Sequence, residues 1–166
     1  MKKVFKVLLA ISILMILLIN LKIIPNPSDF TMTRDIILSR RERGWWQYNF
    51  IPFESYFHIG ENFPANVWLI IGHIGMFFIF GILLALSSEK ISVKKCLLIS
   101  SIFSVLLEVI QFAAAVGVFD IDTIIQHTLG AFVGVIIIKR KCFKSVSSKN
   151  KKIQTFENQL YSVNLA

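Results

Sequence analysis

Long apolar runs separated by short polar segments dominate the chain. Four of these runs are long enough to cross a membrane, at about residues 4–24, 66–86, 96–118 and 123–138. A helix needs about 20 mainly apolar residues to span the hydrocarbon core of a bilayer. The pattern therefore predicts an all-α, polytopic membrane helix bundle of about four transmembrane helices, which form one transmembrane domain over residues 1–141.

The first run could instead be a secretory signal peptide, because Lys2 and Lys3 precede it. However, the run has the length of a full span, whereas the apolar part of a signal peptide needs only about 7–15 residues. It also ends at Lys22 and Pro25 with no small-x-small cleavage site. We therefore interpret it as an uncleaved first helix.

Residues 25–65 form the longest polar stretch between the runs, and we predict an external loop there. All four prolines lie in it, and proline interrupts regular helices. Its second half is rich in aromatic residues, which favour the membrane–water interface: Trp45, Trp46, Tyr48, Phe50, Phe53, Tyr56 and Phe57. We expect this part to lie on the outer leaflet. A disordered loop is the alternative, and the aromatic density argues against it.

The positions of lysine and arginine predict the orientation of the bundle. Three lie before or early in the first helix, three in the turn between helices 2 and 3, and seven from Lys139 onward. Only five lie on the opposite side: Lys22, Arg34, Arg40, Arg41 and Arg43. Because positively charged loops stay in the cytoplasm, both termini are expected there, with residues 142–166 as a polar, basic cytoplasmic tail.

The composition supports a membrane protein rather than a nucleic-acid-binding one. The chain is 55% hydrophobic, whereas soluble domains are about 45–50% apolar. Its net charge of +8 is gathered at the ends of apolar runs and forms no basic stripe interleaved with aromatics. Cys96 and Cys142 form no CxxC pair and lie beside lysines on the expected cytoplasmic side, so a structural disulfide is not expected.

Polar residues inside the spans carry the functional information. An ionisable side chain in mid-membrane costs at least about 2.5 kcal/mol, so it is normally paired or lines a cavity. A helix rises 1.5 Å per residue, which places these residues roughly 7–15 Å below the outer boundary: His73, Glu108, Gln111 and His127. Asp120 and Asp122 lie just above them. We expect one connected polar cluster in which a histidine, preferably His73, pairs with Glu108.

Several interpretations of this cluster stay open. It could be an outward-facing cavity that binds a ligand or performs chemistry, with Glu108, His73 and His127 as candidate catalytic residues, or it could be hydrogen-bonded glue between helices. A metal site would draw its ligands from three helices with no diagnostic spacing, so neither a metal nor another cofactor is predicted. Gly130 and Gly134 form a GxxxG pattern that suits packing within the chain as well as a homo-oligomer.

Four short motifs together resemble those of VanZ-like membrane proteins. Asn49 to Phe53 reads NFIPF, with Pro52 at its fourth position, and resembles that family's N-[LF]-[IV]-P-F motif. His73, Phe77 and Gly81 are similar to its H-x-x-x-[YF]-x-x-x-G pattern, and Glu108 to Gln111 resembles its E-x-x-Q motif. Residues 117–134, GVFDIDTIIQHTLGAFVG, resemble its closing motif. The resemblance covers residues 49–134.

The chain departs from the family pattern around the acidic turn. Thr123 stands where the family usually has a second acid, His127 stands where it has asparagine, and the turn before Asp120 lacks the common arginine. The resemblance implies a membrane fold of four or five helices. For some members it implies a link to resistance against teicoplanin-type glycopeptides, without fixing a reaction.

These observations lead to one leading hypothesis for function and three rivals. The leading one is a multi-pass protein of the bacterial cytoplasmic membrane that binds or shields a lipid-linked cell-wall precursor at the outer face. The rivals are an enzyme acting on a lipid headgroup through Glu108 and a histidine, a structural accessory subunit, and an ion pathway. The last is disfavoured because residues 130–138 are apolar or glycine. The expected partners are the bilayer and the precursor, with no nucleic acid.

Overall fold

Four long apolar helices make up most of the protein. The computed structural model describes residues 2–24, 28–53, 63–88 and 91–140. The helices long enough to cross a membrane are α1 (Lys2–Asn20), α4 (Phe63–Ser87), α5 (Val93–Ala113) and a final span (Ile121–Arg140). The predicted all-α fold with four transmembrane helices is confirmed. The predicted tail, residues 142–166 with Cys142, lies outside the described residues.

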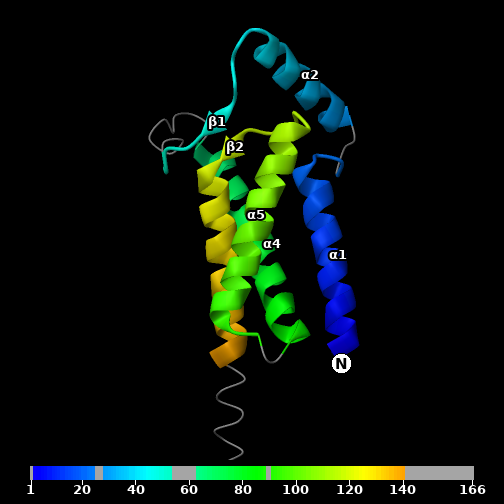
Figure 1. Ribbon diagram of the computed structural model, residues 1–166, viewed down its shortest axis with the longest axis vertical. Helices are drawn as coiled ribbons and strands as arrows, with labels where there is room; N and C mark the ends of the chain where they lie inside the picture. The colour runs from blue at the N-terminus through cyan, green and yellow to red at the C-terminus, as the bar shows by residue number, and fades with distance from the viewer. Residues whose placement is uncertain (1, 25–27, 54–62, 89–90, 141–166) are drawn as a thin grey trace, which may run out of the picture.

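The four helices run alternately up and down as a bundle (Figure 1). α1 begins at the end of the bundle where the final span stops, and α1 packs mainly against α4. The opposite end, which we call the cap end, carries α2 and both short strands (Figure 1). All polar residues of the predicted cluster lie in the half of the bundle nearer this end.

The outer faces of the spans are apolar, as expected for contact with lipid. Large exposed side chains include Val4 of α1, Ile79 of α4, Leu98 of α5 and Leu129 of the final span. Extended apolar surface of this kind marks a membrane-contacting protein. The interior is built around Phe77 and other buried side chains, which pack together between the helices: Phe80, Leu84, Leu107, Ala131 and Val135.

Glycines bring the final span and α4 into backbone contact. A Cβ at Gly130 would meet the carbonyl of Ile74, and one at Gly134 would meet that of Phe78. On α4, Gly81 lies against the backbone of Ala131 in the same way. Small residues allow such close approach of membrane helices. The GxxxG pattern therefore packs inside the chain.

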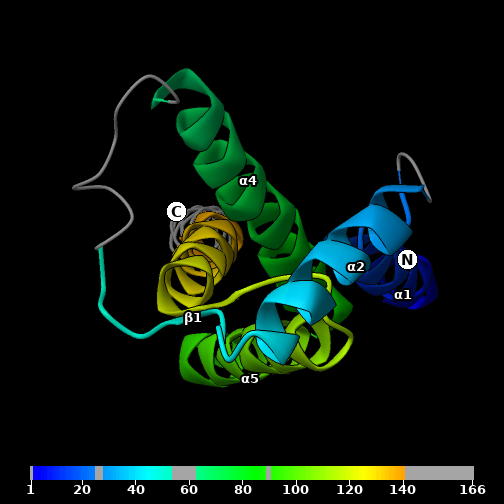
Figure 2. The ribbon, with the colours of Figure 1, turned by 90° about the horizontal axis from the view of Figure 1, so that it is seen from above.

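The loop predicted over residues 25–65 is wrong in two respects: it contains the helix α2 (Ser28–Glu42), and α4 already begins at Phe63. α2 lies across the cap end, above α5 and the end of α1 (Figure 2). Its anchors are the buried side chain of Ile37 and a 2.5 Å hydrogen bond from the guanidinium of Arg41 to the carbonyl of Phe112. The prolines at 25 and 27 precede the helix rather than interrupt it. Residues 25–27 and 54–62 of this stretch lie outside the description.

A short pair of parallel strands ties the chain after α2 to the turn before the final span. β1 (Tyr48–Asn49) pairs with β2 (Phe119–Asp120), with Tyr48 opposite Phe119 and Asn49 opposite Asp120. Parallel strands need a long crossover, and here α4 and α5 provide it. The pairing brings the Asn49–Phe53 motif onto the acidic turn.

Candidate functional site

The carboxylate of Glu108 lies buried in α5 and holds the acidic turn in place. Its Oε2 accepts a hydrogen bond of 3.0 Å from the backbone N–H of Asp120. Asp120 Oδ1 in turn accepts a bond of 2.9 Å from the backbone N–H of Asp122. Glu108 is only 1% exposed, so this bond satisfies a group that is costly to bury alone. The turn that begins the final span is thus built on Glu108.

The Asn49–Phe53 motif closes over the same turn. The side-chain amide of Asn49 donates to Asp120 Oδ1 at 3.2 Å. Oδ1 of Asn49 accepts a hydrogen bond from the N–H of Ile51 at 3.1 Å. The backbone N–H of Phe53 donates to Asp122 Oδ1 at 2.8 Å. Phe53 takes a positive φ of 67°, which is an outlier for a bulky residue. Pro52, which precedes Phe53 in the motif, is exposed.

The two histidines lie side by side at the centre of the bundle. His73 Nδ1 is 3.0 Å from Oε1 of Gln126, and His127 Nδ1 is 2.8 Å from Oγ of Ser104. The His127 ring stacks on Phe77 with 3.9 Å between centroids, and the two imidazoles meet edge to face at 5.2 Å. His127 is fully buried, whereas His73 is half-buried. Each ring is therefore fixed by a neutral partner.

The predicted pairing of Glu108 with His73 is wrong, because each residue has a different partner. Among the described residues, Glu108 bonds to the turn and His73 to Gln126. His73 acts electrostatically on the carboxyl of Asp120 and lowers its pKa. Residue spacing could not give how far each helix is rotated about its axis, and this rotation decides which side chains meet.

Gln111 forms a hydrogen bond to the end of α1. Its Nε2 donates to the backbone carbonyl of Asn20 at 2.7 Å, and the amide of Asn20 donates to the carbonyl of Ile16 at 2.8 Å. Asn20 and Lys22 were not among the predicted site residues, although they are polar residues ending an apolar run. Ser104 was also missed. It lies one helical turn before Glu108 and faces the same way.

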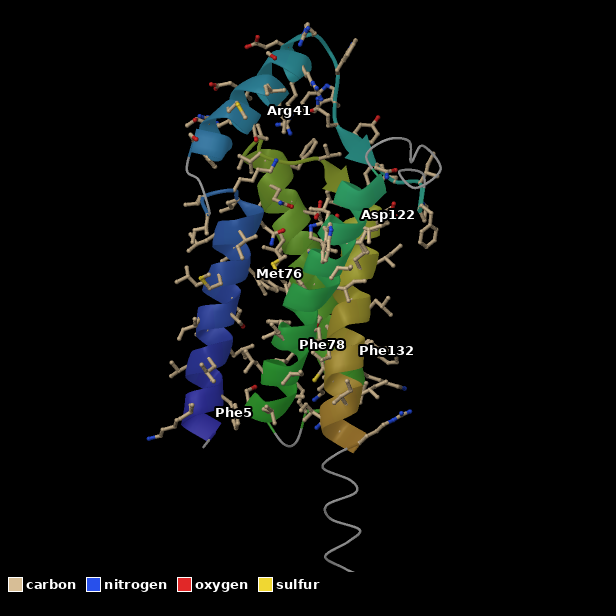
Figure 3. All side chains as sticks on the ribbon, turned by 180° about the vertical axis from the view of Figure 1, so that it is seen from behind. Phe5, Arg41, Met76, Phe78, Asp122 and Phe132 are labelled. Carbon is tan, nitrogen blue, oxygen red and sulfur yellow. The ribbon has the colours of Figure 1, made fainter. Side chains whose placement is uncertain are left out.

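Between α1, α4 and α5 lies a cavity of about 290 Å³, which we call the polar cavity. It is lined by Ile19, Asn20, Lys22, Trp68, Leu69, Gly72, His73, Met76 and Gln111. The polar members come from all three helices. Figure 3 shows Met76 on α4, below the cap end that Arg41 and Asp122 mark. Trp68 and Leu69 are also exposed on the outer surface of α4, so the cavity adjoins the lipid-facing surface.

Burial raises the pKa of Asp120, which lies just outside the final span. The negative charge of Asp122 acts in the same direction. The hydrogen bonds from the N–H of Asp122 and the amide of Asn49, together with the charge of His73, oppose the rise in pKa. Asp120 is thus a carboxyl that keeps its proton to higher pH than an exposed aspartate does.

Two buried atoms of the site have no hydrogen-bond partner among the described residues. They are Asp122 Oδ2 and His127 Nε2. Such atoms are uncommon in folded proteins and point to water, a ligand or stored strain. In the part of the chain that the structure describes, no group of three or more His, Cys, Asp or Glu residues is arranged to hold a metal ion.

One family model matches a range of residues that covers the whole of this site. The model of the VanZ/LLP1 family matches residues 5–144, which include every site residue described above. A search of the curated proteins and a search of the solved structures gave no significant match. The motifs singled out in the sequence all lie within the matched residues.

Proposed function

The chain belongs to the VanZ/LLP1 family, and on that premise we propose that its cap end binds a lipid-linked cell-wall precursor. The protein is then a multi-pass protein of a bacterial cytoplasmic membrane, with both termini in the cytoplasm and the cap end outside. By holding or shielding the precursor, it would contribute to resistance against glycopeptides of the teicoplanin type, which meet their target at that face.

The observation that carries the proposal is the polar cavity. It joins hydrogen-bonding side chains of Asn20, His73 and Gln111 to an apolar wall formed by Ile19, Leu69 and Met76. A lipid-linked molecule has the same two parts, a polar head and an apolar chain. The position of the cavity, beside the lipid-facing surface of α4 and near the cap end, suits entry from the outer leaflet.

An enzyme acting on a lipid headgroup through Glu108 and His73 or His127 remains the alternative. The contacts favour binding instead. Glu108 Oε2 is occupied by the N–H of Asp120, and the Ser104–His127 pair is sealed from solvent, with both residues 0% exposed. A general base needs to reach the proton that it removes. A purely structural accessory role would leave the cavity without a ligand.

The test is to fill the cavity while leaving the fold intact. Gly72 lines the cavity and Gly75 does not, and a Cβ added at either position meets no atom within 4 Å. Gly72→Leu should therefore occlude the cavity, with Gly75→Leu as the matched control. A photoreactive residue at position 69 of the full chain would capture the bound lipid in the native membrane, for identification by mass spectrometry.

We expect a lipid-linked precursor on the wild type and on Gly75→Leu, and its loss on Gly72→Leu. The same photoreactive residue at position 129, on the outer face of the final span, reports ordinary bilayer lipid. If positions 69 and 129 capture the same lipids in every variant, the cavity has no ligand of its own and the proposal is rejected.

A further inference from the structure

Lys22 has a backbone conformation that is unusual for a residue with a side chain. Its φ is +57°, in the left-handed region where helices usually place glycine to end. The hydrogen bonds are those of a helix-ending turn, from the N–H of Ile23 to the carbonyl of Leu18 at 3.0 Å and from the N–H of Lys22 to Ile19 at 2.9 Å. A lysine therefore occupies a position where glycine would be less strained.

Lys22 is exposed and lies at the wall of the polar cavity. Lys22 lies two residues beyond the α1 span, which ends at Asn20. A lysine just beyond the end of a span normally extends its ammonium group to the membrane–water interface. Among the described residues that line the cavity, Lys22 is the single lysine and no carboxylate is present. Strain of this kind collects at functional sites.

We propose that the polar cavity binds the phosphate of an anionic lipid, with Lys22 as the phosphate-binding residue. This inference rests on the proposed function and names the chemical class of its ligand. Gln111 lines the same space as Lys22, and its amide can donate a second N–H to a phosphate oxygen while the first bonds to the carbonyl of Asn20. The first carbons of the lipid chain then lie against Ile19, Leu69 and Met76.

The cavity is large enough for only part of a lipid ligand. A volume of about 290 Å³ lies just below the usual range for ligand pockets, about 300–1,000 Å³. It holds a phosphate with the start of a chain but no large sugar or peptide headgroup. The rest of the headgroup would extend toward the cap end, where the exposed aromatic side chains of Tyr48 and Phe50 lie.

Binding of defined lipids to the purified full chain tests the inference. Native mass spectrometry would compare phosphatidylglycerol with diacylglycerol of the same chains, which lacks the phosphate, and with inorganic phosphate. The variants are Lys22→Gln, which removes the charge, Lys22→Gly, which also relieves the strained backbone, and Lys22→Arg, which keeps the charge. Lys94→Gln, at the opposite end of the bundle, is the matched control.

We expect the wild type to bind phosphatidylglycerol more tightly than diacylglycerol, and Lys22→Gln and Lys22→Gly to weaken that binding about tenfold. Lys22→Arg and Lys94→Gln should bind as the wild type does. Lys22→Gly should unfold at the same temperature as the wild type or a higher one, which separates lost binding from lost folding.

Equal binding of both lipids, wild-type binding by Lys22→Gly, or binding of inorganic phosphate without any preference for the lipid would overturn the inference. These outcomes are independent of the occlusion experiment. If Gly72→Leu blocks lipid capture while Lys22→Gly does not alter the preference for phosphate, the proposed function stands and only the assignment of Lys22 fails.

Discussion

Glu108 Oε2 and the backbone N–H of Asp120 lie 3.0 Å apart, so a buried carboxylate of α5 serves as the acceptor for the turn that follows it. The same turn then holds the Asn49–Phe53 motif through Asp120 and Asp122. Three of the motifs seen in the sequence are thus held together by hydrogen bonds at the cap end. Its geometry depends on Glu108 as an acceptor more than as a charge.

Replacing Glu108 tests this role directly. Glu108→Gln keeps an oxygen that can accept the N–H of Asp120, so its thermal stability in detergent should be close to that of the wild type. Glu108→Ala leaves that N–H without its acceptor and should lose about 1–3 kcal/mol. Val109→Ala, a neighbour on the lipid-facing surface, is the control. Equal losses for the Gln and Ala variants would show that the charge itself matters.

Asp120 predicts a pH dependence of stability with a definite sign. Its pKa is raised in the folded protein, chiefly by burial, so the folded state holds the proton that the unfolded state releases above the ordinary value of 3.8. This contribution to stability is complete below that value and is lost as pH rises through the folded pKa. Asp120→Asn keeps the oxygen that bonds to Asp122 but cannot titrate.

The measurement is the unfolding temperature of the wild type and of Asp120→Asn at a series of pH values from 3.8 upward. The stability of the wild type relative to the variant should fall as pH rises. Taking the difference between the two proteins cancels the titration of other groups. A difference that is flat, or that grows with pH, would contradict the raised pKa.

The spans could be predicted from sequence because about 20 apolar residues in succession leave few alternatives. α2 could not, because its sequence is polar and its stability comes from contacts outside itself. The burial of Ile37 and the bond from Arg41 to Phe112 join residues far apart in the chain. The proline-containing stretch therefore looked like a loop, although Pro25 and Pro27 come before α2 in the sequence and do not interrupt it.

Rise per residue placed His73, Glu108 and His127 in the outer half of the bundle, with Glu108 the deepest. In the structure Glu108 instead bonds to the turn at Asp120, whereas His127 bonds to Ser104, one helical turn further from the cap end. Their partners depend on helix rotation and on the turn at residues 114–120, which spacing alone does not give. The signal that was available but not used is the row Ser100, Ser104 and Glu108, four residues apart and all buried on one face of α5.

The glycine contacts predict opposite effects for substitutions that look alike. Gly130→Ala places a methyl group against the carbonyl of Ile74 and should cost about 1–3 kcal/mol of stability. Gly75→Ala meets open space and should be neutral, or stabilise by up to about 1 kcal/mol. Thermal unfolding measures both. If Gly130→Ala instead unfolds as the wild type does, the contact with α4 is not as close as the structure has it.

Orientation can be tested with reporter fusions. The start of α1, the start of α5 and the end of the final span lie at the same end of the bundle (Figure 1), and among the described residues these three segments carry Lys3, Lys6, Lys94, Lys95, Lys139 and Arg140. An alkaline phosphatase fusion after Asp35, in α2, should be active because the cap end is expected outside. The same fusion after Ala166 should be inactive. Activity at Ala166 would reverse the proposed orientation.

The aromatic segment that follows α2 is expected to lie in the membrane interface. Trp45 is 67% exposed and Trp46 59% exposed, so neither is explained by packing within the protein. Arg43 lies over the ring of Trp45 at 5.9 Å, and Arg41 lies over that of Trp46 at 5.5 Å. Indole rings beside arginines suit the boundary between lipid chains and phosphate headgroups.

Tryptophan fluorescence in vesicles can decide between lipid and water around these rings. The third tryptophan, Trp68, is exposed on the outer face of α4 and would report lipid in any case, so Trp68→Phe is the background. In that background the emission should be blue-shifted and quenched by brominated lipid. Replacing both Trp45 and Trp46 with Phe should remove the signal. Quenching by aqueous iodide alone would mean that the segment stands in water and that the cap end does not rest on the membrane surface.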